Sequence, residues 1–274
     1  MVHTTPGAAE GWRPNVISSF NPDDLLPNAL IIQTATKAGT VEGDAPQVLV
    51  PYVSQDPDAD FVAEGNEITT GGGELDQVAI STHKIASLSV VSRELVAQPG
   101  AADRIAQSMR RAVTTKADQA YLNNPDAPTG LFQLAGIDTA GNLGTDLFAA
   151  YDAVAAIEAD GGQATHLLIN PTDWGTLSKL PVADGSNQSL LANVHDAAQR
   201  SLAGVPVIVH SAVPAGEALM LDQTEVVAAY GQLDLARSDD AFFTSDAVGI
   251  RATWRIGWNI VRPSRLVKLT IGEA

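Results

Sequence analysis

The sequence predicts an α+β protein in which one long helix covers one long β-sheet, with a second, smaller unit beside them. First, apolar residues alternate with polar ones and glycines from Val248 to Ile260, typical of a strand with one buried face. Second, apolar residues recur at helical spacing between Ala101 and Asn123. Third, helical and strand-like segments alternate between residues 130 and 225, which indicates a unit of mixed type.

The long strand and the long helix each have an apolar face, so we predict that they pack against each other. A strand of 13 residues spans roughly 43 Å at about 3.3 Å per residue, and a helix of about 20 residues spans roughly 30 Å. The strand's expected inner face includes Ala252, Trp254 and Trp258. The helix's inner face is expected to comprise Ile105, Met109, Ala112, Val113, Ala117, Ala120 and Tyr121, and its polar side Arg104, Ser108, Arg111, Thr115 and Asp118.

Before this helix, the chain has the pattern of a long hairpin. Strands are predicted at residues 48–53 and 78–91, joined by a polar, glycine-rich segment at residues 54–77. Pro51 suits an edge strand, because proline donates no ladder hydrogen bond. The hairpin has too little apolar material to fold alone, so it should lie on something else. Residues 1–45 read as an extended arm, with a short helix near residues 23–33.

The second unit alternates helices and strands. Thr145 is expected to cap a helix that ends at Ala159 and buries Leu147, Tyr151, Val154 and Ile157. Further elements are predicted as a strand at 166–170, a helix at 171–180, a short helix after a polar loop at 181–188, and strands at 205–209 and 218–221. The chain then continues through strands at 226–230, 248–260 and 265–271.

Composition and charge exclude several classes of protein. The chain of 274 residues has no cysteine, so disulfides and thiolate metal sites are excluded. Its net charge of −16 argues against nucleic-acid binding by the whole surface. Only residues 101–123 and 241–274 are net basic. No secretory signal or membrane-spanning run is visible, so a soluble protein made in cytosol is expected.

Catalytic and metal-binding patterns are weak. His166, Asp173 and Ser178 would form a triad only if the fold brought them together, and a structural histidine is the favoured reading. Four acids have the spacing of calcium-loop ligands, but the position that needs glycine is Phe61, so a solvated acidic loop is favoured over a calcium site; these acids are Asp56, Asp58, Asp60 and Glu67. We therefore predict no catalytic, cofactor or metal site.

Several segments, in order, resemble the major capsid proteins of tailed bacteriophages. They include F-V-A-E-G-N-E-I, I-S-T-H-K-I-A-S-L-S-V-V-S-R-E-L, H-L-L-I-N-P-T-D-W-G-T-L-S-K-L, S-L-A-G-V-P-V-I-V-H-S-A-V-P-A-G and I-R-A-T-W-R-I-G-W-N-I-V-R-P-S-R-L-V-K-L. The resemblance implies the Hong Kong 97-type fold. Its parts would be an N-terminal arm (1–45), an extended-loop hairpin (46–92), a peripheral domain with a spine helix (93–129), an axial domain (130–225) and peripheral-domain strands (226–274).

The resemblance also implies a function and partners. The protein would be a structural subunit, not an enzyme, that self-assembles into pentamers and hexamers of an icosahedral shell around double-stranded DNA. It would need no cofactor and no membrane, and the shell would form in the host cytoplasm. A separate scaffolding protein, a portal and possibly a cement protein would be its partners. Residues 54–77 contain no lysine, so the lysine–asparagine crosslink of some relatives is not carried over.

In the resembling fold the extended loop lies across the neighbouring subunit, so its acids are candidates for intersubunit contacts. Glu64 and Glu67 would meet basic residues of the helix and the long strand, and these are Arg110, Arg111, Arg251 and Arg255. The alternative is that the acids are only solvated and the basic residues face DNA. For the whole protein, an encapsulin-type nanocompartment shell and an α/β enzyme with an unrecognised site remain the competing interpretations.

Overall fold

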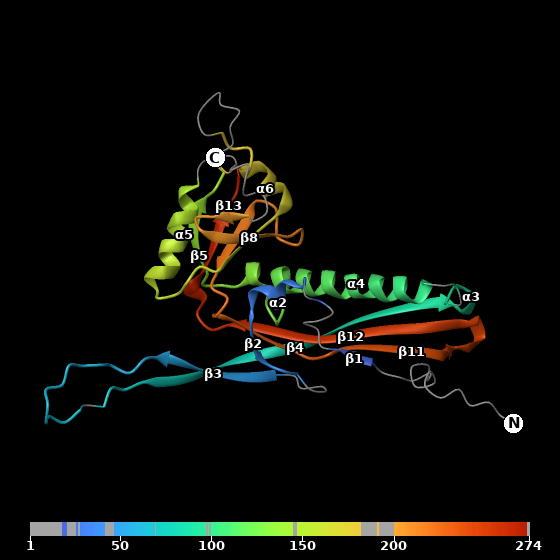
Figure 1. Ribbon diagram of the computed structural model, residues 1–274, viewed down its shortest axis with the longest axis horizontal. Helices are drawn as coiled ribbons and strands as arrows, with labels where there is room; N and C mark the ends of the chain where they lie inside the picture. The colour runs from blue at the N-terminus through green and yellow to red at the C-terminus, as the bar shows by residue number, and fades with distance from the viewer. Residues whose placement is uncertain are drawn as a thin grey trace.

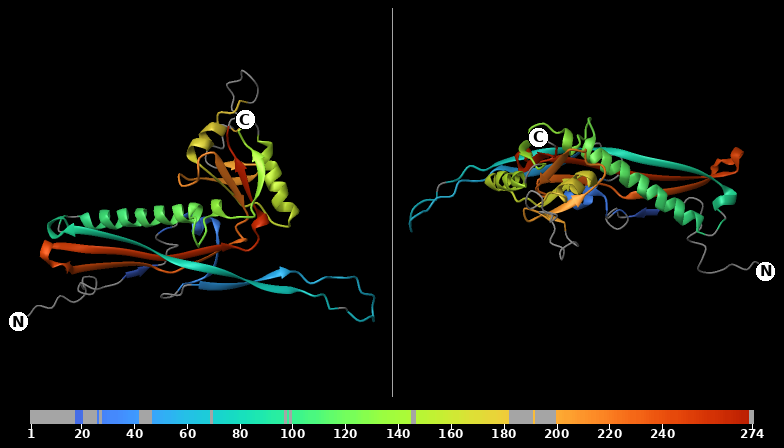
Figure 2. Two further views of the ribbon diagram at one scale, coloured as in Figure 1. Left: turned by 180° about the vertical axis from the view of Figure 1, so that it is seen from behind. Right: turned by 90° about the horizontal axis from the view of Figure 1, so that it is seen from above.

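The computed structural model describes residues 18–20, 26, 28–41, 47–68, 70–96, 98, 100–144, 147–181, 191 and 200–272. Expectations for residues 1–17, for the cap at Thr145 and for the loop and short helix after Pro181 lie outside these residues. The described chain forms a long, flat body and a smaller body that rises from it, with a hairpin extending from one end of the long body (Figures 1 and 2).

The long body is built on a seven-stranded sheet. Its main path runs in the order β1 (Ser18–Phe20), β11 (Leu233–Phe242), β12 (Ala247–Ile260), β10 (Val226–Tyr230) and β2 (Thr36–Gly39). On the other side of β12 lies β4 (Glu74–Ser92), which also pairs with β3 (Gln47–Gln55). The predicted long strand is confirmed as β12, and its antiparallel register with β4 is continuous from Ala247–Ser92 to Gly257–Thr82.

The helix α4 (Ala101–Asn123) lies along one face of this sheet, as predicted (Figure 1). Trp254 and Trp258 are buried in one core with Met109 and Val113 of the helix. The Trp258 ring also meets the Tyr121 ring edge to face, with the ring centroids 5.4 Å apart. Within this core, the Trp254 indole N–H donates to the Gly231 carbonyl at 3.0 Å, so the buried polar group is satisfied.

Two assignments on α4 were wrong. Asp118, expected on the polar side, is only 1% exposed, whereas Ala112, expected inside, is exposed. Asp118 is buried because α2 (Leu30–Thr34) packs against the flank of α4 and covers it. Helical periodicity gives the direction of each side chain, but it cannot show that a distant segment covers the polar flank.

The hairpin is formed by the other half of β4 together with β3. Residues 74–81 of β4 pair with β3, and the next residue, Thr82, already pairs with Gly257 of β12. At this crossing the strands are very close, because a Cβ on Gly257 would lie 2.3 Å from the Ser81 carbonyl oxygen. Pro51 lies in β3, whose only strand partner among the described residues is β4, so the prediction of an edge strand is confirmed.

The smaller body contains a six-stranded sheet. The strand order is β5 (Asp138–Asn142), β13 (Leu266–Thr270), β9 (Glu217–Leu221), β6 (His166–Ile169), β8 (Val205–Val209) and β7 (Ser201–Leu202). The helices α5 (Phe148–Ala159) and α6 (Pro171–Leu177) pack on it, and their buried residues share a second core with the sheet. Short connecting helices are α3 (Arg93–Val96), η2 (Leu131–Gln133), η3 (Phe243–Ser245) and η4 (Pro263–Arg265).

Three further expectations need correction. The strand β11 was missed, because its sequence L-D-L-A-R-S-D-D-A-F is charged and lacks apolar alternation along much of its length. Residues 266–270, grouped with the peripheral strands 226–274, instead pair with β9 and β5 in the second sheet. On α5, Tyr151 is exposed rather than buried, because the sheet covers the face that carries Ala150, Ala153 and Ile157.

Candidate functional site

The extended hairpin is the most conspicuous surface feature of the subunit. Six of its large apolar side chains are exposed, including Phe61, which is completely exposed near the tip; the others are Leu49, Val53, Val62, Ile68 and Leu75. Exposed apolar side chains scattered singly are normal, but a run of them along one projecting element marks a surface used for binding. The hairpin projects away from both bodies in all views (Figures 1 and 2).

The same hairpin is strongly acidic. Residues 54–77 carry seven carboxylates and no lysine or arginine; they are Asp56, Asp58, Asp60, Glu64, Glu67, Glu74 and Asp76. No group of three or more acidic or histidine side chains in the described part of the chain is arranged to hold a metal ion. The hairpin therefore combines exposed apolar groups with a high density of like charge.

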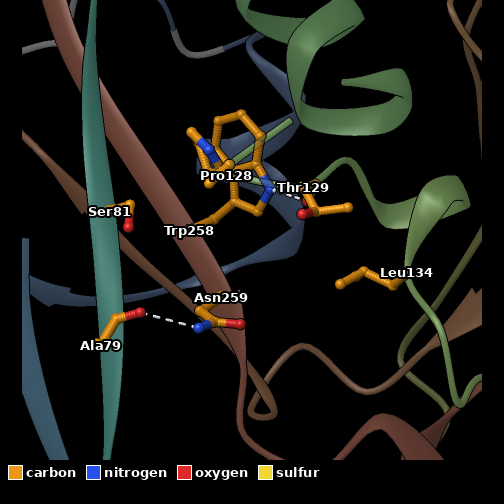
Figure 3. Close-up of a pocket in the computed structure, with 8 residues that line it drawn as sticks. Ala79, Ser81, Pro128, Thr129, Leu134, Trp258 and Asn259 are labelled. Atoms are coloured by element: carbon orange, nitrogen blue, oxygen red, sulfur yellow. Dashed lines mark hydrogen bonds between the residues drawn. The ribbon is translucent and has the colours of Figure 1, made fainter. Parts of the chain in front are cut away.

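In contrast to its tip, the base of the hairpin is firmly attached. The Arg262 guanidinium donates to the Val53 carbonyl at 2.7 Å, and the Asn259 amide donates to the Ala79 carbonyl at 2.9 Å. Arg255 donates to both the carbonyl and the hydroxyl oxygen of Thr82, at 3.2 and 3.1 Å. Because each of these donors lies on or next to β12, the direction of the hairpin is set by the long sheet. Figure 3 shows the Asn259–Ala79 hydrogen bond.

The predicted contact residues do not meet within one subunit. Glu64 and Glu67 are exposed on the loop and form no ion pair with any described residue. Arg111 and Arg251 are exposed on α4 and β12, while Arg110 and Arg255 are half-buried. The Arg110 Nε atom is buried and has no hydrogen-bond partner among the described residues. Any pairing between these acids and arginines requires a second copy of the chain.

Three other basic residues of the C-terminal segment have partners inside the chain. Glu225, only 4% exposed, accepts hydrogen bonds from both Arg262 and Arg265. Arg265 also donates to the Asp160 carbonyl at the end of α5, and Lys268 donates to the Phe132 carbonyl. The Ser264 hydroxyl and the arginine beside it lower the pKa of the Asp160 carboxyl. These groups hold the two bodies together where the chain passes from β12 to β13.

A second buried polar cluster joins α2, α4 and the smaller body. Asp118 accepts a hydrogen bond from the Leu30 backbone N–H at 2.8 Å, and its other oxygen lies 3.3 Å from His210 Nε2. His210 Nδ1 accepts from the Ala212 backbone N–H at 3.2 Å, so the neutral tautomer that donates to Asp118 fits both contacts. Sequence reasoning missed this cluster, because its members are 88 to 180 positions apart.

The described residues do not form the imagined catalytic triad. His166 contacts Thr165, Asp173 accepts from the Gly216 backbone N–H, and Ser178 donates to the Trp174 carbonyl, so the three residues of the imagined triad have separate partners. A pocket of about 100 Å³ lies at the hairpin base, between Ser81, Pro128, Leu134 and Trp258 (Figure 3). It is smaller than the usual ligand site of about 300–1,000 Å³ and has no titratable lining residue.

Comparison with known proteins identifies the chain's family. Residues 28–271 match the phage capsid family, which is almost the whole described chain. The chain belongs to the phage capsid family. It is therefore a structural capsid protein rather than an enzyme, and its place is the virion capsid. No curated protein matches the chain at a significant level.

Solved structures agree with the family on the fold. The capsid of an empty GTA particle superposes with a TM-score of 0.68 at 20% identity, covering 98% of this chain and 96% of that chain. The protein of Gordonia phage Cozz gives 0.69 at 19% identity, covering 100% and 92%. That of Mycobacterium phage Adephagia gives 0.70 at 15% identity, covering 100% and 96%. The fold is the Hong Kong 97 type. None of the described helices is long and apolar enough to cross a membrane.

Proposed function

We propose that this protein is the major capsid protein of a tailed bacteriophage, and that its copies form the pentamers and hexamers of an icosahedral shell around double-stranded DNA. The observation that supports this most directly is the extended hairpin. It is rigidly attached at its base, but its exposed apolar and acidic tip meets no partner surface among the described residues of its own subunit. Such an element is stabilised only by binding, and a second copy is the partner that a shell supplies.

We propose the division of the chain into domains that the resemblance implies, with one change. The seven-stranded sheet, which we call the spine sheet, and α4 form the peripheral domain. Residues 130–225 form the axial domain. The strand β13 (266–270) joins the axial sheet, so the chain crosses between the domains three times: before η2, between β9 and β10, and at η4. Glu225 lies at the second crossing and Arg262 and Arg265 lie at the third, and their ion pairs fix the relative position of the two domains.

Charge supports a contact between the loop of one subunit and the peripheral domain of the next. The loop's acids are opposite in sign to Arg110, Arg111, Arg251 and Arg255, which lie on α4 and β12. Each exposed pair contributes only about 0–1 kcal/mol, but a shell repeats the contact in every subunit. The other partners proposed are those of the resemblance: a separate scaffolding protein, a portal, possibly a cement protein, and DNA bound without sequence specificity. Assembly would take place in the host cytoplasm.

The first test is direct. Purified protein, with a scaffolding protein where one is needed, should form closed particles of uniform size in negative-stain electron microscopy. Particles recovered from infected cells should contain double-stranded DNA, whereas a nanocompartment would contain a protein cargo. A protein that stays monomeric under all these conditions would contradict the proposal.

The charge contact is tested by reversal and rescue. Glu64→Lys with Glu67→Lys should abolish assembly but leave the unfolding midpoint of the subunit unchanged, because both side chains are exposed. Adding Arg111→Glu and Arg251→Glu should restore part of the particle yield. The matched control is Asp126→Lys with Asp240→Lys, which changes two exposed acids away from the loop. Raised salt should weaken the native contact, since exposed charges are screened beyond about 8 Å at physiological ionic strength. Normal shells from the loop reversal would show that the basic residues serve another purpose, such as facing DNA.

A further inference from the structure

The described parts of the N-terminal arm run across the spine sheet and reach both bodies of the subunit. The strand β1 pairs with β11 at one end of the sheet's main path, and β2 pairs with β10 at the other end. Between them, α2 lies beside α4 near the base of the smaller body (Figure 1). We call residue 26 and residues 28–36, which include α2, the corner segment.

The corner segment is buried in a core that both bodies share. Leu30 and Ile31 are at most 1% exposed. They belong to the same core as Trp258 of the long body and as Leu219 and Leu221 of the smaller body. Because protein interiors are close-packed, the two bodies cannot change their angle around this volume unless the corner segment moves.

Polar contacts join the corner segment to α4 and, through α4, to the smaller body. The Leu30 N–H donates to one oxygen of Asp118 at 2.8 Å, and the Thr34 and Tyr121 hydroxyls lie 3.0 Å apart. The other Asp118 oxygen lies 3.3 Å from Nε2 of His210, in the turn after β8. A single buried carboxylate thus connects the corner segment, α4 and the smaller body.

A second set of contacts joins the corner segment to the chain crossing between β9 and β10. The Thr36 hydroxyl donates to the Gln223 carbonyl at 3.0 Å, and the Gln223 side-chain amide donates to the Ala35 carbonyl at 3.4 Å. The corner segment therefore touches the smaller body's connections in two separate places, the turn at His210 and the crossing at Gln223.

The chain crossings alone do not fix an angle, because a few connecting residues can absorb a change in backbone dihedral angles. The ion pairs of Glu225 hold the second and third crossings together, whereas the corner segment packs against α4 and the second crossing at once. The arm, which lies outside both sheets' crossings, thus supplies the contact that braces one body against the other.

We propose that the corner segment sets the angle between the peripheral and axial domains, and that a displacement of the arm is transmitted through it to the axial domain. The first part concerns the free subunit. The second part rests on the proposed self-assembly, because rings of five and of six require different angles from one sequence. The arm would be the element that selects between these angles.

Pulsed electron paramagnetic resonance on the free subunit tests the first part, because a chain without cysteine accepts labels only where cysteines are introduced. Arg111→Cys on α4 and Tyr151→Cys on α5 place spin labels at exposed positions of the two domains. The native corner should give one narrow distribution of label distances. Leu30→Ala with Ile31→Ala should make the distribution at least about twofold broader, because the crossings then act as free hinges. The control Val248→Ala removes a buried side chain at the far end of β12 and should leave the distribution unchanged.

A second pair of variants removes polar contacts and keeps the volume of the corner. Asp118→Asn with Thr36→Val removes the carboxylate oxygen that faces His210 and the hydroxyl that donates to the second crossing. The matched control is Asp103→Asn with Thr115→Val, on the exposed side of α4. If the alanine variant does not unfold cooperatively, this pair decides through the same label distances.

Hydrogen exchange gives a second readout on the polar variant. Exchange at residues 30–35 and at residues 210–213 should rise together by at least about tenfold, because the two places open as one unit, and the control should match the native protein. A rise at only one of these places would overturn the coupling between arm and axial domain.

The outcomes separate this inference from the proposed function. A native distance distribution in the corner variants would overturn the inference, and so would equal broadening in the controls, which would report general loosening. In assembly, the polar variant should give particles of mixed size, and uniform native particles would overturn the selection of ring geometry by the arm. Native protein that forms no shells would instead contradict the proposed function, while the label distances in the free subunit still decide whether the corner segment sets the angle.

Discussion

The strand β4 runs through two regions of opposite character. Its residues 82–92 lie beside β12 under α4, where the core includes a fully buried Trp254. Its residues 74–81 lead into the hairpin, where Leu75 is 80% exposed and Phe61 completely so. One continuous strand thus runs from the core beneath α4 to the exposed hairpin.

The comparison shows how stability and assembly are divided within one chain. Burial of apolar surface under α4 stabilises the subunit, because buried apolar area contributes about 25 cal/mol per Å². The hairpin contributes little to that core, so its side chains remain available for a partner. Substitutions in the spine should therefore change folding, and substitutions at the hairpin tip should change assembly only.

The largest effect is expected from Trp254→Ala in the spine. It removes a fully buried indole and its hydrogen bond to Gly231, and should lower the free energy of unfolding by about 3–5 kcal/mol. Urea denaturation of the unassembled subunit measures this value. The control is Phe61→Ala at the hairpin tip, which should change it by less than about 0.5 kcal/mol. Similar losses from both would mean that the hairpin is part of the folding unit.

The junction between the two regions is sensitive to Gly257→Ala. The new methyl group would meet the Ser81 carbonyl oxygen at 2.3 Å, and backbone cannot move aside as a side chain can. We expect a loss of about 1–3 kcal/mol, typical of overpacking, with faster hydrogen exchange in residues 74–81. Gly175→Ala in α6 has no atom within 4 Å of the new methyl and should be neutral or stabilising. An unchanged midpoint for Gly257→Ala would show that the strands separate easily at the crossing.

Asp118→Leu addresses the buried cluster on the flank of the spine. It leaves the Leu30 N–H without its acceptor and His210 without its carboxylate, which should cost about 1–3 kcal/mol. Thermal unfolding of the free subunit measures the loss, and Asp103→Leu on the exposed side of α4 is the matched control. A stability equal to that of the control would mean that the Asp118 contacts contribute no net stability.

The smallest effect is expected in the pH dependence of stability, through His166 in the smaller body. Burial lowers the pKa of His166 below its usual value near 6.5, so the unfolded chain binds its proton more readily than the folded one. The stability that this shift contributes is complete above the unfolded pKa and is lost as pH falls through the folded pKa. His166→Gln should therefore reduce the fall in urea midpoint between pH 7.5 and pH 5, and the exposed His83→Gln should not. The same slope in both variants would assign the pH dependence to other groups.

Much of the spine sheet and of α4 was predictable from the sequence, because one periodicity dominates each of these elements. The alternation of β12 and the helical spacing of Met109, Val113 and Tyr121 each specify one apolar face, and two such faces must cover each other. The positions of β10 and β8 follow for a similar reason, since both are short runs of apolar, β-branched residues. The acidic composition of the loop is likewise a property of the sequence alone.

The tertiary structure decided where these elements meet. The charged β11, the burial of Asp118 and the pairing of β13 with β9 depend on segments far apart in sequence, and no local pattern encodes them. The pairing of both Arg262 and Arg265 with Glu225 also joins residues that no local sequence pattern links. Among the described residues, β4 has β12 as its only strand partner along 82–92; this too was decided by the tertiary structure, because a strand's sequence does not show how many neighbours it will have.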